Sequence, residues 1–239
     1  MDYLKIWRHE QRFHTQAGWL NSYFSFSFDQ YFDPARMQFG SLRVFNDDTI
    51  APASGFPMHP HRNMEILTYV LQGTLAHEDS MGTQGRIHAG SIQRMSAGTG
   101  ILHSEMNPDE TEPVHLYQMW FLPHTKDLKP EYEQKDFSWD LPLNQWMALA
   151  SGSEEISKKS NTVFIHQDLT LWTLRLQKSH TMPYHLNPNR KAYVQIIQGK
   201  IKIEDQTLKA GDAAEIAQLT SWNFQSVDPE SRILLIDLV

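Results

Sequence analysis

Apolar and polar residues alternate with a period of two over much of the chain. The stretch "YFSFSF" (residues 23–28) alternates aromatic residues with serine, as a half-buried strand does. Similar apolar runs recur at hairpin spacing, and most are bounded by Gly, Pro, Asn or Asp; they are "SLRVFND", "EILTYVLQGTLAHED", "VHLYQMWFL", "LTLWTLRLQ", "AYVQIIQGKIKIED" and "RILLIDLV". Long helical patterns are scarce, and residues 125–137 have room for one or two helical turns that Pro130 interrupts. The pattern predicts an all-β fold of antiparallel barrels or sandwiches.

A weak internal repeat indicates two similar domains. "MEILTYVLQGTLAHED" and "KAYVQIIQGKIKIED" each contain a strand–Gly–strand hairpin, and "HAGSIQRMSAGTG" has a counterpart in "KAGDAAEIAQLTS". Gly73 then aligns with Gly199, and Gly90 with Gly211. We therefore expect two tandem β-barrels, residues 1–135 and 136–239, with a connector near residues 124–145.

Composition excludes several classes of function. The formal net charge is −7 and the sequence has no Lys/Arg run, so it predicts no direct binding to nucleic acid or to anionic lipid. Protein partners are not excluded by this argument. Cysteine is absent, which rules out disulfides, thiolate nucleophiles, Fe–S clusters and Cys-type zinc sites. A metal would have to bind to histidine, carboxylate or backbone oxygen.

The sequence also predicts a location. The N-terminal stretch "MDYLKIWRHEQRF" lacks the apolar core of a signal peptide, and the longest apolar runs are far shorter than a membrane span. We therefore expect a cytoplasmic protein with no membrane partner.

Two short clusters carry ligand-type side chains. "GFPMHPHRNME" contains His59 and His61, and "GTGILHSEMN" contains His103 and Glu105. Residues i and i+2 of a strand point to the same face, roughly 6.5–7 Å apart, so two such pairs on neighbouring strands can aim three imidazoles and one carboxylate at one ion. This donor set suits a borderline divalent metal such as iron, and six-coordination would leave two positions for a ligand and for O₂ or water. Pro60 cannot donate to a ladder, so we expect this segment at a strand's start or at a sheet edge.

Several other polar residues leave alternatives open. Glu65 falls on the ligand face if its strand is regular. The alternative is that its carboxylate accepts a hydrogen bond from the free ring N–H of a ligating imidazole and so orients that ring. His77, His88 and His115 are isolated in the sequence, and we interpret them as structural or surface residues. The pair Asp47-Asp48 is interpreted as a turn, because adjacent strand residues point to opposite faces.

The second half of the repeat has lost most of these side chains. At the offsets of the aligned glycines, the positions that correspond to the five His and Glu residues of the first half are His185, Asn187, Lys191, Phe224 and Ser226. We therefore expect a C-terminal barrel without metal, serving a structural or regulatory role. A separate site on His180 and His185 is the weaker alternative.

The sequence resembles the cupin superfamily at these clusters. "HPHRNME" followed by "YVLQG" resembles its first motif, and "GSIQRMSAGTGILHSEMN" resembles its second. The similarity is closest to the pirins and pirin-like quercetinases: it runs through "GWLNSYFSFSF", "RVFNDDTIAPASGFPMHPHRNMEILTYVLQGTLAHEDSMG" and "SAGTGILHSEMNP" and covers roughly residues 18–122.

This resemblance implies a bicupin with metal only in the N-terminal barrel. The pirin ligand pattern matches His59, His61, His103 and Glu105, and it implies that Glu65 is not a ligand. It also implies iron as the ion, although the same donors would accept Zn, Mn, Co, Ni or Cu. Pirins are commonly monomers, so we expect a monomer.

The same resemblance supports two classes of function. The first is a flavonol dioxygenase of the quercetin 2,3-dioxygenase type, which uses O₂, opens the flavonol ring and releases carbon monoxide, with Glu105 as the general base. The alternative is a non-enzymatic metal-binding redox sensor or regulator that acts on a protein partner, such as a transcription factor. A sugar isomerase or epimerase, as found among other cupins, is a third and weaker possibility.

Overall fold

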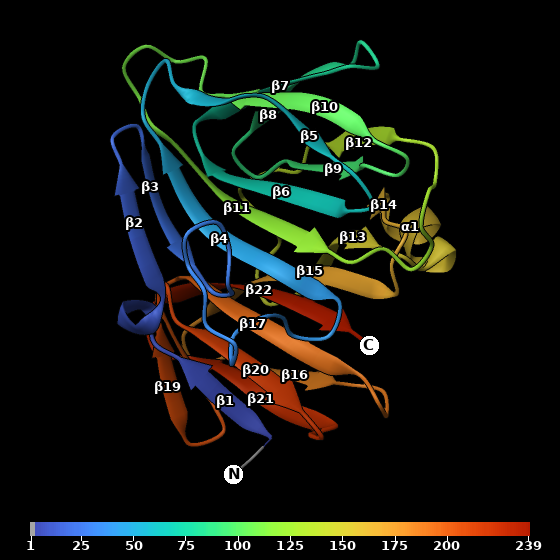
Figure 1. Cartoon of the computed structure of the whole chain (residues 1–239). Helices are drawn as coiled ribbons and strands as arrows, with labels where there is room; N and C mark the ends of the chain where they lie inside the picture. The colour runs from blue at the N-terminus through green and yellow to red at the C-terminus, as the bar shows by residue number, and fades with distance from the viewer. Residues whose placement is uncertain (1–2) are drawn as a thin grey trace. The chain divides into compact units, whose positions relative to one another are not determined.

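The structure, a computed structural model, describes residues 3–239, and almost all of its regular elements are strands. Among these residues there are 22 strands, one α-helix, α1 (Glu154–Ser160), and one short 3₁₀-helix, η1 (His9–Gln11) (Figure 1). The prediction of an all-β fold is confirmed. Met1 and Asp2 lie outside the described residues. They are the first residues of the stretch that was examined for a signal peptide and of the first predicted domain. Within residues 3–239, no helix combines the length and the hydropathy that a membrane-spanning segment needs.

Close contacts divide the chain into two compact units that exchange short segments. The N-terminal unit comprises residues 13–139 and Val163–Gln167. The C-terminal unit comprises residues 3–12, Asp140–Thr162 and Asp168–Val239. Each unit thus includes a short segment from the other half of the chain. The predicted division into domains at residues 135/136 stays a prediction.

The N-terminal unit contains two antiparallel sheets. In the large sheet the strands follow the order β12-β9-β6-β11-β4-β3-β2, and in the small sheet the order β5-β10-β7-β8. The large-sheet strands are β2 (Phe13–Ala17), β3 (Leu20–Phe24), β4 (Leu42–Ile50), β6 (Glu65–Gln72), β9 (Ile92–Ser96), β11 (Val114–Phe121) and β12 (Glu131–Lys135). The small-sheet strands are β5 (Gly55–His61), β7 (Thr74–Asp79), β8 (Gln84–His88) and β10 (Ile101–Met106), and the two-residue strand β14 (Val163–Phe164) also belongs to this unit.

The interior of this unit lies between its two sheets. Leu75 and Ile87 of the small sheet pack in one buried cluster with Val70 and Leu116 of the large sheet. Burial alternates along β10, so Ile101, His103 and Glu105 point inward while the residues between them are more exposed. The same alternation that builds the core therefore carries two polar side chains into it.

The C-terminal unit repeats this arrangement. Its large sheet follows the order β1-β20-β17-β22-β15-β13, and its small sheet the order β16-β21-β18-β19. The strands are β1 (Leu4–Trp7), β13 (Trp146–Ser151), β15 (Leu169–Gln177), β16 (Thr181–His185), β17 (Lys191–Gln198), β18 (Lys200–Ile203), β19 (Gln206–Lys209), β20 (Ala213–Ala217), β21 (Ser221–Ser226) and β22 (Glu230–Leu238). Position by position, β20, β17, β22 and β15 take the places of β9, β6, β11 and β4, and β1 takes the place of β12.

The predicted repeat is visible in the backbone of its hairpins. Gly73 joins β6 to β7 with φ +77°, and Gly199 joins β17 to β18 with φ +74°. Both positions need the left-handed backbone that glycine adopts at little cost. None of the four sheets of the described chain closes on itself. The expectation of two closed barrels is therefore not confirmed, and each unit is a pair of facing open sheets.

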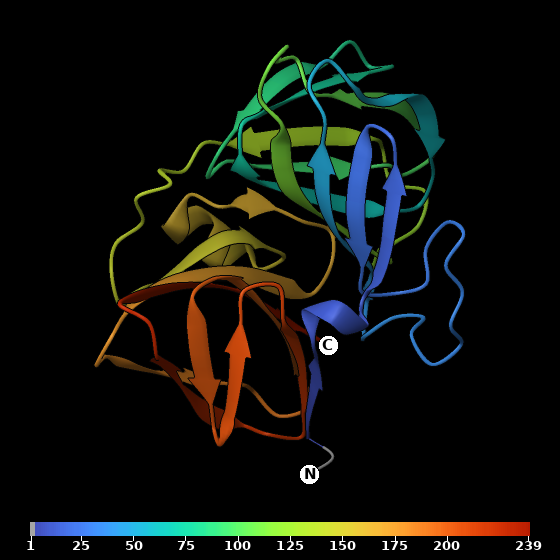
Figure 2. The ribbon, with the colours of Figure 1, turned by 90° about the vertical axis from the view of Figure 1, so that its left-hand side faces the viewer.

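Several local predictions were wrong. Strand β3 ends at Phe24, and residues 25–41 form a long loop, visible in blue in Figure 2, rather than continuing the "YFSFSF" alternation. The predicted helical turn within residues 125–137 is instead strand β12, which pairs with β9. Asp47 and Asp48 lie inside β4, not in a turn, and the strand sends their side chains to opposite faces.

Candidate metal centre

The small sheet brings three predicted histidines together. His59 lies directly opposite His103 in the pairing of β5 with β10. The imidazole centroids are 4.5 Å apart for His59 and His103, 4.9 Å for His61 and His103, and 4.8 Å for His59 and His61. Their ligand-type nitrogen atoms all lie within 4.8 Å of one another. β5 is an edge strand of its sheet, as Pro60 predicted.

Glu105 enters the same interior from β10. The register between β10 and β5 shifts between His103 and Glu105, which marks a β-bulge at this point. Glu105 is nevertheless 2% exposed, and it lines the same cavity as His59 and His61. The fourth predicted ligand therefore lies beside the three imidazoles.

Three side chains of the facing large sheet hold the Glu105 carboxylate. Gln93 Nε2 donates to Oε1 at 2.6 Å, and Gln118 Nε2 donates to Oε2 at 2.7 Å. The Thr68 hydroxyl donates to Gln118 Oε1 at 2.7 Å and accepts from Gln93 Nε2 at 3.0 Å. The Tyr132 hydroxyl donates to Gln93 Oε1 at 3.1 Å, and burial, followed by the nearby Glu105 and Asp79 carboxylates, raises the pKa of Tyr132. Each carboxylate oxygen thus accepts a hydrogen bond from an amide N–H.

Two of the three imidazoles, those of His61 and His103, are in the neutral state that a metal ligand requires. Burial, followed by the charges of the other imidazoles, lowers the pKa of His61 to about 4 and that of His103 to about 3. Both rings are therefore neutral at physiological pH and keep a lone pair. His59 Nδ1 lies 2.7 Å from the Pro57 carbonyl oxygen, so Nδ1 carries the hydrogen and the Nε2 lone pair is available.

Buried nitrogen atoms without partners test whether a metal fits here. His61 Nε2 and both ring nitrogens of His103 are buried and have no hydrogen-bond partner. A buried polar atom left unpaired costs free energy, so such atoms are rare unless something else binds them. Three imidazoles and one carboxylate around one point match a borderline divalent ion. The residues present therefore fit the predicted kind of metal.

Glu65 lies apart from this cluster. Its carboxylate accepts from the Ser96 hydroxyl at 2.9 Å and from the His166 backbone N–H at 3.1 Å, both through Oε2. Its side chain is buried, and burial raises its pKa. Among the described residues it joins no group of ligand atoms around a point. Its contacts fit neither of the two roles that the sequence left open.

His77 was interpreted as an isolated histidine, but it lies beside the cluster. It is 2% exposed and sits opposite Glu105 in the pairing of β7 with β10. Its ligand-type nitrogen lies within 4.8 Å of a ring nitrogen of His103 and of a carboxylate oxygen of Glu105. His88 and His115 contact Thr74 and Asp47 instead, in keeping with the structural or surface role expected of them. The signal that could have singled out His77 is its place inside the strand "TLAHED", two residues before Asp79.

A small cavity opens on the cluster. Its volume is about 150 Å³, and its lining residues are Phe28, Asn46, Asp48, Phe56, His59, His61, Glu105, Gln118 and Trp120. Trp120 packs edge-on against His61 with ring centroids 4.7 Å apart. Asn46 Oδ1 and Trp120 Nε1 are buried and have no hydrogen-bond partner. The cavity therefore combines aromatic walls with one free acceptor and one free donor.

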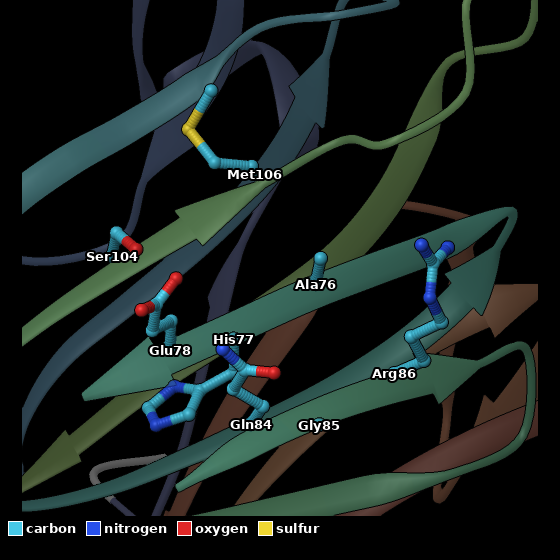
Figure 3. Close-up of a pocket in the computed structure, with 8 residues that line it drawn as sticks. All are labelled: Ala76, His77, Glu78, Gln84, Gly85, Arg86, Ser104 and Met106. Carbon is cyan, nitrogen blue, oxygen red and sulfur yellow. The ribbon is translucent and has the colours of Figure 1, made fainter. Parts of the chain in front are cut away.

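A second hollow lies on the outer face of the small sheet. It has a volume of about 350 Å³, and Figure 3 shows that side chains from β7, β8 and β10 line it, including Glu78, Arg86 and Ser104. His77 is also among the lining residues in Figure 3, but its side chain is buried, and the alternation along β7 turns it to the face opposite that of Ala76 and Glu78. The outer hollow and the histidine cluster are thus on opposite faces of one sheet.

Comparisons with known proteins agree with this geometry. The family model described as Pirin matches residues 7–121, which include all four predicted ligands, and the model described as the quercetinase C-terminal cupin domain matches residues 149–238. A protein of Escherichia coli strain K12 named quercetin 2,3-dioxygenase is 40% identical over 232 residues, covering 95% of each chain. The chain belongs to the pirin family.

Other relatives of this pirin are named in the same way or have been solved. A Pasteurella multocida protein, provisionally named a quercetin 2,3-dioxygenase, is 41% identical over 95% of this chain and 94% of its own. The crystal structure of YhhW from Escherichia coli matches with a TM-score of 0.92 and 37% identity, over 99% of this chain and 97% of that one. A second structure, described as the bacterial pirin YhhW in complex with nickel(II), matches with a TM-score of 0.91 and 37% identity, over 98% of each chain.

The C-terminal cupin unit of this pirin fills the corresponding positions with apolar side chains. The pair of Met182 with Phe224, between β16 and β21, takes the place of the pair of His59 with His103 between β5 and β10. The pair of Tyr184 with Trp222 takes the place of the pair of His61 with Ile101. Tyr184, Trp222 and Phe224 belong to the core of this unit. Strand pairing thus aligns His59 with Met182 and not, as the glycine offset suggested, with His185.

Proposed function

We propose that this pirin is a metal-dependent dioxygenase that opens the ring of flavonols such as quercetin. The observation that carries the proposal is the cluster of three imidazoles, with buried nitrogens of His61 and His103 that have no partner, beside a hydrogen-bonded carboxylate and an aromatic cavity. The names of the relatives at about 40% identity support the same activity. His59, His61, His103 and Glu105 would hold the ion, and we propose iron, although the donor set also suits Zn, Mn, Co, Ni or Cu.

The overall reaction sets what the site must do. The two ring bonds to the carbon that bears the 3-hydroxyl break, and this carbon leaves as carbon monoxide. One atom of O₂ is added to each of the two neighbouring carbons: one of them becomes an ester carbonyl, and the other, already a carbonyl carbon in the flavonol, becomes a carboxylate. A bound ion would supply a meeting point for substrate oxygen and O₂ and would stabilise negative charge as it develops.

Glu105 is the group that would take the proton of the substrate's 3-hydroxyl. Its Oε1 accepts from Gln93 and lies 3.3 Å from the Thr68 hydroxyl, whereas its Oε2 accepts only from Gln118, so Oε2 is the oxygen with room for a further proton donor. Gln93 and Gln118 hold the carboxylate still, so the proton acceptor has a fixed position relative to the cavity. Removing the proton makes the substrate ring electron-rich, which favours its attack on O₂.

The cavity walls would orient the substrate. Phe28, Phe56 and Trp120 offer aromatic surfaces for flat rings, and they limit the water that reaches the reacting carbon. Asn46 Oδ1 can accept a hydrogen bond from a ring hydroxyl, since it is buried and has no partner. These features favour a planar, hydroxylated aromatic substrate.

One observation favours the alternative function, a metal-binding redox sensor that regulates a protein partner. The cavity of about 150 Å³ is smaller than the roughly 300–1,000 Å³ of pockets that enclose drug-sized ligands. A flavonol would therefore need Phe28, in the loop of residues 25–41, or Phe56 to move aside. A sensor would need no such opening, because a change in the valence of the ion alters the charge of the site without a ligand.

The test is the decay of the quercetin absorbance band in air, with the iron-loaded full chain and with His103→Ala. The dioxygenase predicts a decay that requires both iron and His103, together with release of carbon monoxide. His115→Ala is the matched control, since His115 pairs with Asp47 away from the cluster. Absence of decay while iron is bound would contradict the dioxygenase and support the sensor.

A further inference from the structure

We propose that His77 and Asp79 are positioning residues for the metal ligand His103. The ring nitrogen of His103 that does not coordinate the ion would donate its hydrogen to His77, and His77 would donate to Asp79. The inference rests on the proposed ligand role of His103, but it concerns two residues that the ligand pattern leaves out.

Asp79 is a fixed acceptor at the end of this chain of contacts. Its Oδ1 accepts from the backbone N–H groups of Met81 at 2.9 Å and Thr83 at 3.0 Å. Its Oδ2 remains for His77 Nε2, at 3.3 Å. Although burial alone would raise it, these hydrogen bonds hold the pKa of Asp79 below its ordinary value. The carboxylate therefore stays ionised and can only accept.

This contact fixes which nitrogen of His77 carries the hydrogen. Because Asp79 accepts from Nε2, the neutral ring has its hydrogen on Nε2 and a lone pair on Nδ1. The ring is held in place by stacking on Tyr132, with centroids 4.5 Å apart and planes inclined by 25°. His77 Nδ1 is buried and has no hydrogen-bond partner. His77 thus presents one free acceptor inside the unit.

His103 is the donor that this acceptor lacks. Its ring centroid lies 5.4 Å from that of His77, and the ligand-type nitrogens of the two rings lie within 4.8 Å of each other. No hydrogen bond joins the rings in this structure, and both nitrogens of His103 are without a partner. When one of them binds an ion, the other must carry a hydrogen in a buried site. His77 Nδ1 is a buried acceptor on the neighbouring ring that has no partner of its own, and we assign this hydrogen to it.

The arrangement accounts for three buried nitrogens at once. His77 Nδ1 and the two nitrogens of His103 have no hydrogen-bond partner in this structure, and an ion together with one hydrogen bond would pair all three. A ligating histidine usually donates its second N–H to a carboxylate or another acceptor, which fixes its ring and raises its basicity. Here the carboxylate would act through an intervening imidazole.

His77 could instead bind the ion itself, since His77, His103 and Glu105 also form a group of ligand atoms. The sheet argues against this. His59 and His61 lie on β5, on the other side of β10 from β7, and their ligand atoms group with His103 without His77 among the described residues. The two roles differ in the number of imidazoles bound to the metal.

The experiment is a titration of the metal-free full chain with cobalt(II), followed by its visible d–d bands and by X-ray absorption. His77→Leu removes the acceptor while filling similar space. Asp79→Asn would donate an amide N–H to His77 Nε2, so the hydrogen of His77 would lie on Nδ1. Two N–H groups, one of His77 and one of His103, would then face each other, and the hydrogen bond between the rings would be lost. Both variants should bind cobalt roughly 10- to 100-fold more weakly, with altered band positions and an unchanged number of bound imidazoles.

His77→Gln is the conservative rescue, because its carbonyl oxygen can accept from His103, and it should recover most of the affinity. His115→Gln is the matched control, since His115 forms another His–Asp pair in the same unit and should bind cobalt like the wild type. Wild-type affinity in both His77→Leu and Asp79→Asn would overturn the inference. Loss of one bound imidazole in His77→Leu would also overturn it, because His77 would then be a ligand.

The readout separates this inference from the proposed function. Cobalt affinity and band positions do not depend on turnover, so a chain that binds cobalt as expected but leaves quercetin intact would contradict only the dioxygenase. A wild-type chain that binds no cobalt would contradict the metal centre, and the positioning role with it.

Discussion

Gln118 donates to Glu105 Oε2 at 2.7 Å from the sheet opposite the one that carries Glu105. The contact joins the two faces of the N-terminal unit at the candidate centre, and its acceptor is 2% exposed. Removing a donor from a buried carboxylate costs more than breaking an exposed hydrogen bond, since the charge is left poorly solvated.

Gln118→Leu should therefore destabilise the metal-free protein by about 1.5–3 kcal/mol, measured by urea denaturation. The matched control is Gln195→Leu in the C-terminal unit, where the buried glutamine makes a weak contact with the neighbouring Ile196 carbonyl at 3.4 Å. Gln195→Leu should lose less free energy of unfolding than Gln118→Leu. An equal or larger loss in Gln195→Leu would mean that the charge of Glu105 plays no special part.

Glu65→Gln should leave nickel(II) affinity within about 2-fold of the wild type, whereas Glu105→Gln should lower it by roughly 10-fold or more. Glu65 bonds to Ser96 and to the His166 backbone, away from the imidazoles. Isothermal titration of both variants measures this, and a large loss in Glu65→Gln would return Glu65 to the ligand set.

The stability of the metal-free protein should fall as the pH decreases from about 7 toward 4. The unfolded chain binds protons at histidines near pH 6.5, while the folded chain keeps His61 neutral to about pH 4 and His103 to about pH 3. The unfolded state thus binds more protons in this window, so the free energy of unfolding rises with pH there and levels off above it. Urea denaturation at a series of pH values measures the slope. His103→Asn should flatten it, and an unchanged slope would contradict the assignment.

Asn46→Val should raise the KM for quercetin by roughly 2- to 10-fold with little change in kcat. Asn46 Oδ1 is a buried acceptor without a partner in the cavity, and a neutral hydrogen bond to a substrate hydroxyl contributes about 0.5–1.5 kcal/mol. Steady-state kinetics distinguishes binding from chemistry here. A fall in kcat at constant KM would instead place Asn46 among the groups that act in the reaction step.

Gly98→Ala should destabilise the N-terminal unit by about 2–4 kcal/mol. Gly98 has φ +46°, and an added Cβ would lie 1.9 Å from the Leu128 carbonyl oxygen, so both backbone strain and a steric clash oppose the change. Gly82→Ala is the matched control. It has φ +85° and nothing within 4 Å of the added Cβ, so it meets only the strain, about 1–2 kcal/mol. Similar melting temperatures for the two variants would contradict the predicted clash.

The fold and the main cluster were predictable because their signals are local. The β6–β7 hairpin follows from two apolar runs around Gly73, and the pairs His59/His61 and His103/Glu105 follow from the period of a strand. Helix α1 was missed although its signals are also local. Ser153 caps it by accepting from the Ile156 N–H, Glu154 and Glu155 follow in the first turn, and Lys158 and Lys159 lie in the last.

The surroundings of the centre were not predictable, because they depend on strand pairing. Gln93 and Gln118 carry no ligand signature, and only the packing of the large sheet against β10 brings their amides to Glu105. His77 lies opposite Glu105, which is 28 residues later in the chain. The register of β7 against β10 that brings them together cannot be derived from the sequence alone. Strand β12, "EYEQK", is an edge strand and lacks the apolar run that marks the predicted strands, so residues 125–137 carry no sequence signal for it.

The place of β1 in the C-terminal unit has a consequence for the order in which the chain can fold. Trp7 Nε1 donates to Glu215 Oε1 at 2.8 Å across 208 residues of sequence, and β1 pairs along β20 (Figure 1). During synthesis β1 is made well before its partner β20 and must wait for it. The N-terminal unit takes its equivalent edge strand, β12, from nearby sequence. Removal of β1 should therefore impair the C-terminal unit first, although β1 precedes the N-terminal unit in the sequence.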